Sequence, residues 1–232
     1  MEPTAHPERD PRPEPTSRPG RFEFSREAFR SFRTTGAIAP SGRSLAARLA
    51  APLDPPGGRH PVRVLEVGAG TGAVTRELAT RLGPADRLDV VEVNPHFVRV
   101  LESALRHDLA LAAVAGQVRL HERSILDVEL EHRYDVVVSG LPFTNFEPAQ
   151  VRAMLRRHLA LLIPGGDLTF FGYLGTRWAR GLFSGRAEAR RHRAAMAVER
   201  EYAERCGVGR GTVWRNLPPA HVWHLRAPEE DR

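Results

Sequence analysis

The stretch that decides the fold is Val64-Leu65-Glu66-Val67-Gly68-Ala69-Gly70-Thr71-Gly72-Ala73-Val74-Thr75. The apolar, β-branched run over 62–67 predicts a strand, the glycines predict a tight turn, and 73–82 predicts a helix. Strand, turn and helix form the opening unit of a doubly wound α/β sheet, where ligands bind at the carboxyl end of the strand. Glycines let the backbone pass close beneath a ligand, and the start of the helix offers unpaired N–H groups.

Two acidic residues suggest what binds at this turn. The spacing Gly-x-Gly-x-Gly is shorter than the dinucleotide pattern Gly-x-Gly-x-x-Gly, and Glu66 precedes the first glycine by two residues. Its carboxylate would repel a pyrophosphate and suits a ligand that carries a cation. Glu92 ends the next predicted strand, 87–93, about twenty residues further on, where a carboxylate accepts hydrogen bonds from both ribose hydroxyls in nucleoside-binding sheets.

The rest of the chain continues the alternation of strands and helices. Strands are predicted at 118–121, 134–139 and 168–173, helices at 97–107 and 148–160, and two last strands on either side of Pro218-Pro219. A short helix over 45–50, capped by Ser41 or Ser44, precedes the first strand. This order predicts a doubly wound α/β fold with an N-terminal helical extension.

The domain organisation follows from composition. Residues 1–20 hold six prolines among charged residues and predict a disordered tail. Residues 21–60 predict an amphipathic, helical cap, 61–226 the main domain with an Arg-rich helical insertion at 177–205, and 227–232 a charged tail. The total of 232 residues fits one domain with a full core plus these appendages.

Composition also excludes several kinds of chemistry. The chain contains no lysine, so all 34 residues in the Lys and Arg total are arginines. We assign this feature to codon bias, and it excludes a lysine nucleophile. The single Cys206 excludes an internal disulfide, and no histidine spacing indicates a metal site. Without a signal pattern or a membrane-length apolar run, the chain is expected in the cytoplasm, with peripheral binding to the inner membrane face left open.

Arginine is concentrated in two segments that flank the central body. Residues 21–50 hold six Arg and two acids, and residues 177–215 hold ten Arg and four Glu. Within 22–33, phenylalanines fall on one side of a helix and arginines on the other. Such a helix suits an anionic membrane surface, although most amphipathic helices pack their apolar side on their own domain. Both roles remain open.

The opening stretch resembles motif I of the class I S-adenosylmethionine-dependent methyltransferases, whose cofactor carries an ammonium and a sulfonium. The resemblance implies this cofactor and a seven-stranded, mostly parallel sheet with an antiparallel terminal strand. Glu92 would hold the ribose, and Ser124 and Ile125 would lie against the adenine. The cofactor-binding residues implied are Glu66, Gly68, Ala69, Gly70, Thr71, Gly72, Glu92, Val93, Ser124, Ile125, Ser139, Gly140 and Leu141.

Methyl transfer from a sulfonium is an in-line displacement, so catalysis rests on positioning the nucleophile and excluding water. An amine nucleophile must be neutral, and hydrogen-bond acceptors can align its lone pair. The candidates for this role are Ser139, the Gly140 carbonyl, Asn145 and the Tyr173 hydroxyl.

The residues after the fourth strand bear on the acceptor. Adenine-N6 methyltransferases carry a four-residue motif here: a polar residue (Asn, Asp or Ser), then any residue, then Pro, then Tyr or Phe. This chain has Gly140-Leu141-Pro142-Phe143, which keeps the aromatic residue and lacks the polar first residue. The stretches 36–43, 139–146 and 214–220 are more similar to the soluble bacterial phospholipid N-methyltransferases that act on phosphatidylethanolamine, a resemblance that covers most of 22–225. The Arg-rich segment and the Pro-rich tail depart from that family.

The resemblance implies stepwise N-methylation of phosphatidylethanolamine, up to phosphatidylcholine, with ornithine lipid as a neighbouring acceptor. A membrane lipid would be the substrate, and an anionic membrane surface would bind the basic segments. The alternatives are an rRNA adenine-N6 methyltransferase, with nucleic acid a disfavoured partner, and a binding module that retains the fold without activity. Substrate or membrane contacts are expected from Phe29, Arg33, Ile38, Ser41, Arg43, Phe143 and Arg215.

Overall fold

The structure is a computed structural model that describes residues 42–53, 60–174, 186–216 and 218–229. The expected tail at 1–20, the amphipathic segment at 22–33 and the first part of the Arg-rich segment lie outside these ranges.

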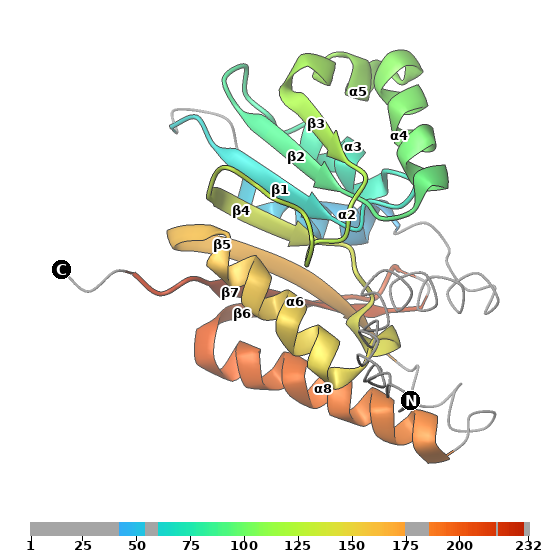
Figure 1. The fold of residues 1–232 in the computed structure, drawn as a ribbon, viewed down its shortest axis with the longest axis vertical. Helices are drawn as coiled ribbons and strands as arrows, with labels where there is room; N and C mark the ends of the chain where they lie inside the picture. Colours follow the sequence, from blue (N-terminus) through green and yellow to red (C-terminus); the bar gives the residue numbers. More distant parts are fainter. Residues whose placement is uncertain (1–41, 54–59, 175–185, 217, 230–232) are drawn as a thin grey trace, which may run out of the picture.

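Seven strands form one sheet in the order β3-β2-β1-β4-β5-β7-β6 (Figure 1). The first five strands are parallel, β7 is antiparallel to β5, and β6 is antiparallel to β7. The predicted doubly wound, mostly parallel sheet is confirmed, and the antiparallel strand that comes last in sequence lies between β5 and β6. The strands are β1 (Arg63–Val67), β2 (Arg87–Val91), β3 (Val118–His121), β4 (Tyr134–Ser139), β5 (Leu162–Tyr173), β6 (Gly207–Val213) and β7 (Ala220–Arg226).

Helices cover both faces of the sheet (Figure 1). One face carries α2 (Arg43–Leu49), α3 (Ala73–Ala79), α4 (Pro95–His107) and α5 (Leu109–Ala112), and the other carries α6 (Pro148–Ala160) and α8 (Arg186–Cys206). Three short 3₁₀ turns complete the described elements: η1 (Ala51–Leu53), η2 (Ala115–Gln117) and η3 (Phe143–Asn145). None of the helices in the described ranges is long and apolar enough to cross a membrane.

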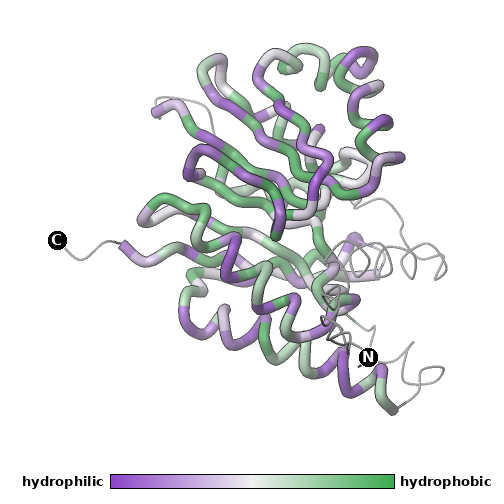
Figure 2. The backbone as a smooth tube through the Cα atoms, in the orientation of Figure 1, coloured by the Kyte–Doolittle hydropathy of each residue, from purple (hydrophilic) through white to green (hydrophobic). Residues whose placement is uncertain are grey.

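The sheet has an apolar core on each side. Val64 packs with the α2 and α3 side and its neighbour Leu65 with the α6 and α8 side, because successive side chains of a strand point to opposite faces. Strands buried on both faces need mostly apolar residues, which explains the valines and leucine of β1 and the three consecutive valines of β4. In Figure 2, green apolar segments run through the strands, and hydrophilic and hydrophobic residues alternate along the outer helices.

Helix α8 is the latter part of the Arg-rich segment. Its residues Ala195, Val198 and Tyr202 are buried in the same core as the centre of the sheet. Its arginines at 193 and 200 are exposed on the opposite side. This part of the segment therefore belongs to the layer that covers the sheet.

Local chemistry sets several boundaries differently from the sequence prediction. Helix α3 ends at Ala79, three residues early, and β5 begins at Leu162 because the chain pairs with β4 both before and after a Gly165 turn of positive φ. The prediction that Ser41 or Ser44 caps the helix before β1 is wrong: its N-cap is Gly42. The Gly42 N–H donates to Oδ1 of Asn216 at 2.9 Å, so a distant side chain fixes the start of α2.

Candidate active site

The loop from β1 to α3 is built on three glycines in the left-handed region. The φ angles of Gly68, Gly70 and Gly72 are 77°, 56° and 83°, a conformation that other residues adopt at a cost. Gly72 is the N-cap of α3, so the loop leads straight into the helix. A Cβ added at Gly70 would meet no atom within 4 Å, which leaves the outer side of the loop open to a ligand.

The inner side of the same loop is tightly packed against the end of β4. A Cβ added at Gly140 would lie 2.5 Å from the carbonyl oxygen of Gly68, and one added at Gly68 would lie 2.6 Å from Cδ2 of Leu141. The Gly140 N–H also donates to the Val67 carbonyl at 2.8 Å. Absence of side chains at these two glycines therefore lets β4 approach the loop.

Glu92 links the loops that follow β1 and β2. It lies just after β2, is 2% exposed, and accepts from the Gly70 N–H at 2.9 Å through Oε2 and from the Asn94 N–H at 2.8 Å through Oε1. Burial raises the pKa of this carboxyl group, and the N–H groups of Asn94 and Gly70 oppose the rise. The arrangement holds an acceptor at the carboxyl edge of the sheet.

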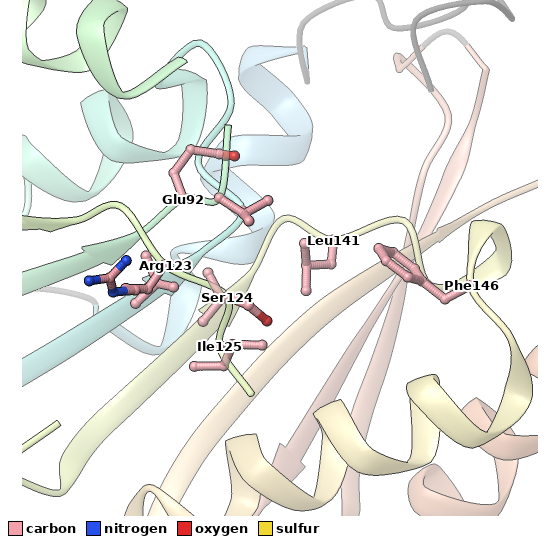
Figure 3. A pocket seen from close by; sticks show the side chains of 10 residues that line it. Glu92, Arg123, Ser124, Ile125, Leu141 and Phe146 are labelled. Carbon is pink, nitrogen blue, oxygen red and sulfur yellow. The ribbon is translucent and has the colours of Figure 1, made fainter. Parts of the chain in front are cut away.

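A cleft opens beside Glu92 (Figure 3). Apolar side chains form most of its walls, with Leu141 and Phe146 on the side of β4 and Ile125 opposite. Its lining comprises Val67, Gly68, Val91, Glu92, Val93, Arg123, Ser124, Ile125, Leu141 and Phe146. An acid among apolar walls matches a ligand with hydroxyl groups and a flat apolar ring.

The cleft brings together six of the residues expected to bind cofactor, namely Gly68, Glu92, Val93, Ser124, Ile125 and Leu141. Gly70 reaches it indirectly through the bond to Glu92. The expected residues that do not line the cleft are Glu66, Ala69, Thr71, Gly72, Ser139 and Gly140. Arg123 and Phe146 were missed; Phe146 belongs to the 139–146 stretch, whereas no sequence pattern pointed to Arg123.

Glu66 lies beneath the loop rather than in the cleft. It is fully buried, and neither of its carboxyl oxygens has a hydrogen-bond partner. Burial raises the pKa of the Glu66 carboxyl group to about 8, and the polar groups of Thr75 offset part of this rise. The Thr75 hydroxyl lies near Glu66 without completing a hydrogen bond to it. The acid is therefore protonated at pH 7 unless a cation lies beside it, which qualifies the expectation of a fixed negative charge here.

The side-chain candidates for aligning the nucleophile lie at the ends of β4, η3 and β5. Ser139 is fully buried at the end of β4, where its Oγ accepts weakly from the Leu141 N–H at 3.5 Å. Tyr173 ends β5 three residues beyond the Ser139 partner, Phe170, and packs edge-to-face on Phe171. Asn145 ends the η3 turn and is half-buried. Their catalytic role remains a proposal.

The residues predicted to contact the substrate or the membrane differ in their exposure. The prediction for Phe143 is corrected, because this ring is fully buried against Phe170, with centroids 5.4 Å apart, and against His158 at 6.1 Å. Phe146 is the ring that lines the cleft. Arg43 and Arg215 are exposed. The other four, Phe29, Arg33, Ile38 and Ser41, lie outside the described residues.

The strand order, the glycine loop and the buried acid after β2 define a nucleoside-binding α/β enzyme fold of the methyltransferase type. A family model described as a methyltransferase domain matches residues 64–166. The chain is 31% identical over 175 residues to the ornithine lipid N-methyltransferase of Singulisphaera acidiphila, covering 72% of this chain and 77% of that protein. The chain therefore belongs to the class I S-adenosylmethionine-dependent methyltransferases.

Two further likenesses are informative. The chain is 26% identical over 112 residues to the tRNA1(Val) (adenine(37)-N6)-methyltransferase of Actinobacillus pleuropneumoniae, which is 45% of this chain and about half the length of that relative, 46%. The N-methyltransferase NodS from Bradyrhizobium japonicum WM9, solved in complex with S-adenosyl-L-homocysteine, superposes with a TM-score of 0.55 and 20% identity over 81% of this chain and 86% of that one. The second likeness is one of fold.

The residues present fit S-adenosylmethionine. The open outer side of Gly70, the Glu92 carboxylate and the apolar wall at Ile125 provide a loop, a hydroxyl acceptor and a ring surface in one cleft. Glu92 would hold the ribose, and Ser124 with Ile125 would lie against the adenine. When bound, the cofactor supplies a methyl group carried on a sulfonium.

Proposed function

We propose that this protein N-methylates an amine-bearing membrane lipid, with ornithine lipid as the preferred acceptor. The observation that carries the proposal is the match to an ornithine lipid N-methyltransferase over most of both chains. The sequence prediction had ranked phosphatidylethanolamine first, and this relative favours the neighbouring acceptor instead. Both lipids present a primary amine, so the same site chemistry serves either one.

The packing at Gly140 supports an acceptor other than adenine. In adenine-N6 methyltransferases this position carries Asn, Asp or Ser. Any such side chain would begin with a Cβ 2.5 Å from the Gly68 carbonyl oxygen, a separation that real Cβ atoms essentially never show. The aromatic residue of the same motif, Phe143, is buried and does not face the cleft. The chain therefore lacks both groups that such enzymes use to hold the base.

The chain contributes position rather than strong acid–base chemistry in this proposal. The amine lone pair would form the new N–C bond as the C–S bond breaks, the electron pair of the C–S bond would stay on sulfur to give a neutral thioether, and the methylated ammonium would then lose a proton to water. Asn145 and Tyr173 stand at the ends of η3 and β5, where their polar groups could orient an incoming amine. Leu141 and Phe146 exclude water from the adjoining cleft.

The test is to incubate the protein with methyl-labelled S-adenosylmethionine and vesicles that contain ornithine lipid, phosphatidylethanolamine or neither, with tRNA and rRNA in parallel. Label is expected in ornithine lipid above phosphatidylethanolamine, and Glu92→Gln should lower incorporation together with cofactor affinity. Label in RNA alone, or in no fraction while calorimetry shows intact cofactor binding, would overturn the proposal. Label in phosphatidylethanolamine alone would overturn the preference for ornithine lipid.

A further inference from the structure

The turn between β6 and β7 brings an exposed tryptophan to the edge of the sheet that holds the cleft. Strand β6 is antiparallel to β7, which is antiparallel to β5, so β6 runs in the direction of β1 and ends at the same edge (Figure 1). The next residue, Trp214, is 74% exposed, and Arg215 is exposed beside it. Among the described residues, the other large exposed apolar side chains are Leu109, Leu126 and Val208.

This turn is held firmly in place. Asn216 is 5% exposed; its Oδ1 accepts from the Gly42 N–H at 2.9 Å and its Nδ2 donates to the Pro218 carbonyl at 2.8 Å. The Leu174 N–H, just after β5, donates to the Pro219 carbonyl at 2.6 Å. The start of α2, the end of β5 and the turn therefore meet at one place.

The same bonds place a second exposed arginine nearby. Arg43 follows Gly42 directly and is exposed at the first position of α2. No acidic residue occurs in 42–53 or in 207–227, so the ionic side-chain charge of these two segments is positive. We name Trp214, Arg215 and Arg43 the rim cluster.

Tryptophan and arginine together suit a bilayer surface. An indole has an apolar body and one N–H donor, and its preferred position is the membrane–water interface. Arginines near the surface of a membrane rich in anionic lipid each add about a fivefold increase in binding. The Trp214 indole is 74% exposed on a turn fixed by hydrogen bonds, so its apolar ring is unfavourably exposed to water and is free to contact lipid headgroups.

We propose that the rim cluster docks the protein on an anionic phospholipid bilayer, with Trp214 in the headgroup layer and the two arginines on lipid phosphates. This orientation turns the carboxyl edge of the sheet, with the cleft, toward the lipid. The proposal rests on the proposed function, because this orientation would serve a methyltransferase whose substrate is a membrane lipid. Binding to vesicles can nevertheless be measured without any methylation.

The test uses the full chain and vesicles of phosphatidylcholine with or without phosphatidylglycerol. Trp214→Ala and the double variant Arg43→Gln, Arg215→Gln are compared with Leu109→Ala, which removes a side chain that is 92% exposed, and with Arg106→Gln at the exposed end of α4. Both controls lie near the outer strand β3, whereas the turn that carries Trp214 follows the other outer strand, β6 (Figure 1). Binding to anionic vesicles should fall at least fivefold for Trp214→Ala and over tenfold for the double variant, and should stay unchanged in the controls.

Methylation assays separate the two proposals. Trp214→Ala should keep its activity on amine lipid dispersed in detergent and lose it on vesicles. Vesicle binding that falls in the rim variants, in a protein that methylates no lipid, would support docking and sink the proposed function. Equal vesicle binding by Trp214→Ala, the double variant and the controls would overturn docking, as would rim variants that lose RNA binding but keep vesicle binding.

Discussion

Gly140→Ala tests the close approach of β4 to the glycine loop. The new Cβ would lie 2.5 Å from the Gly68 oxygen and 3.6 Å from the Val67 oxygen, both of them backbone atoms. Contacts below 3.0 Å essentially never occur, so the strand end must move away from the loop by at least half an ångström. That movement strains the bond of 2.8 Å from the Gly140 N–H to the Val67 carbonyl.

Two effects should follow from this movement. Overpacking of this kind costs about 1–3 kcal/mol, which lowers the melting temperature of a chain of this size by roughly 2–10 °C. The displaced loop also carries the Gly70 N–H that holds Glu92, so the cofactor site is distorted as well. We expect S-adenosylmethionine to bind at least about tenfold more weakly, equivalent to about 1.4 kcal/mol. Thermal unfolding and titration calorimetry measure the two effects separately.

Gly116→Ala is the matched control. Gly116 lies in η2, its φ is not positive, and an added Cβ would meet no atom within 4 Å. The same chemical change should therefore leave cofactor affinity unchanged and shift stability by no more than about 1 kcal/mol, in the stabilising direction. If Gly140→Ala unfolds at the same temperature as Gly116→Ala and binds the cofactor equally well, the inferred contact between β4 and the loop is wrong.

Three other predictions concern buried groups. Because the pKa of Glu66 is raised to about 8, this acid holds a proton at pH 7, and the positive charge of the bound cofactor should cause the proton to be released. Calorimetry in buffers of different ionisation enthalpy would detect the release, and Glu66→Gln should abolish it. Glu199 is 4% exposed and burial raises its pKa to about 8, so its folded form keeps a proton that the unfolded chain loses near pH 4.5, and stability should fall as pH rises from 4.5 to 8. Glu199→Gln should flatten that fall by up to roughly 5 kcal/mol in denaturant unfolding, and an unchanged pH profile would contradict the assignment. Phe143→Ala should cost about 3–5 kcal/mol in the same assay, whereas Phe146→Ala should weaken cofactor binding with little loss of stability.

The parts of the fold that depend on residue type and spacing along the chain could be predicted from the sequence. The glycines at 68, 70 and 72 all adopt positive φ, and the apolar runs of β1 and β4 are buried on both faces. Glu92 was placed correctly at the cleft because its distance from the glycine turn fixes it at the end of the neighbouring strand. Spacing along the chain carries this information.

The orientation of single side chains needed the structure. Phe143 and Phe146 stand three residues apart, and only the η3 turn decides that the first enters the core and the second faces the cleft. Glu199 lies in the segment predicted as an Arg-rich helical insertion, and α8 places it against Gly172, where an added Cβ would lie 3.4 Å from Oε2 of Glu199. The first result depends on the geometry of a local turn, and the second on packing between α8 and β5.

The antiparallel strand explains why the rim cluster and the cleft can share an edge. A parallel strand beside β5 would require a crossover back from the far edge, usually a helix of a dozen or more residues. Because β7 is antiparallel, the chain joins β6 to β7 by a short turn at the carboxyl edge itself, and the register pairs Tyr173 of β5 with Ala220. The turn that carries Trp214 therefore stands beside the ends of β5 and β4. A bilayer docked at that turn would face the carboxyl edge of the sheet on which the cleft opens, which is why the proposed acceptor and the proposed docking surface support each other while remaining separately testable.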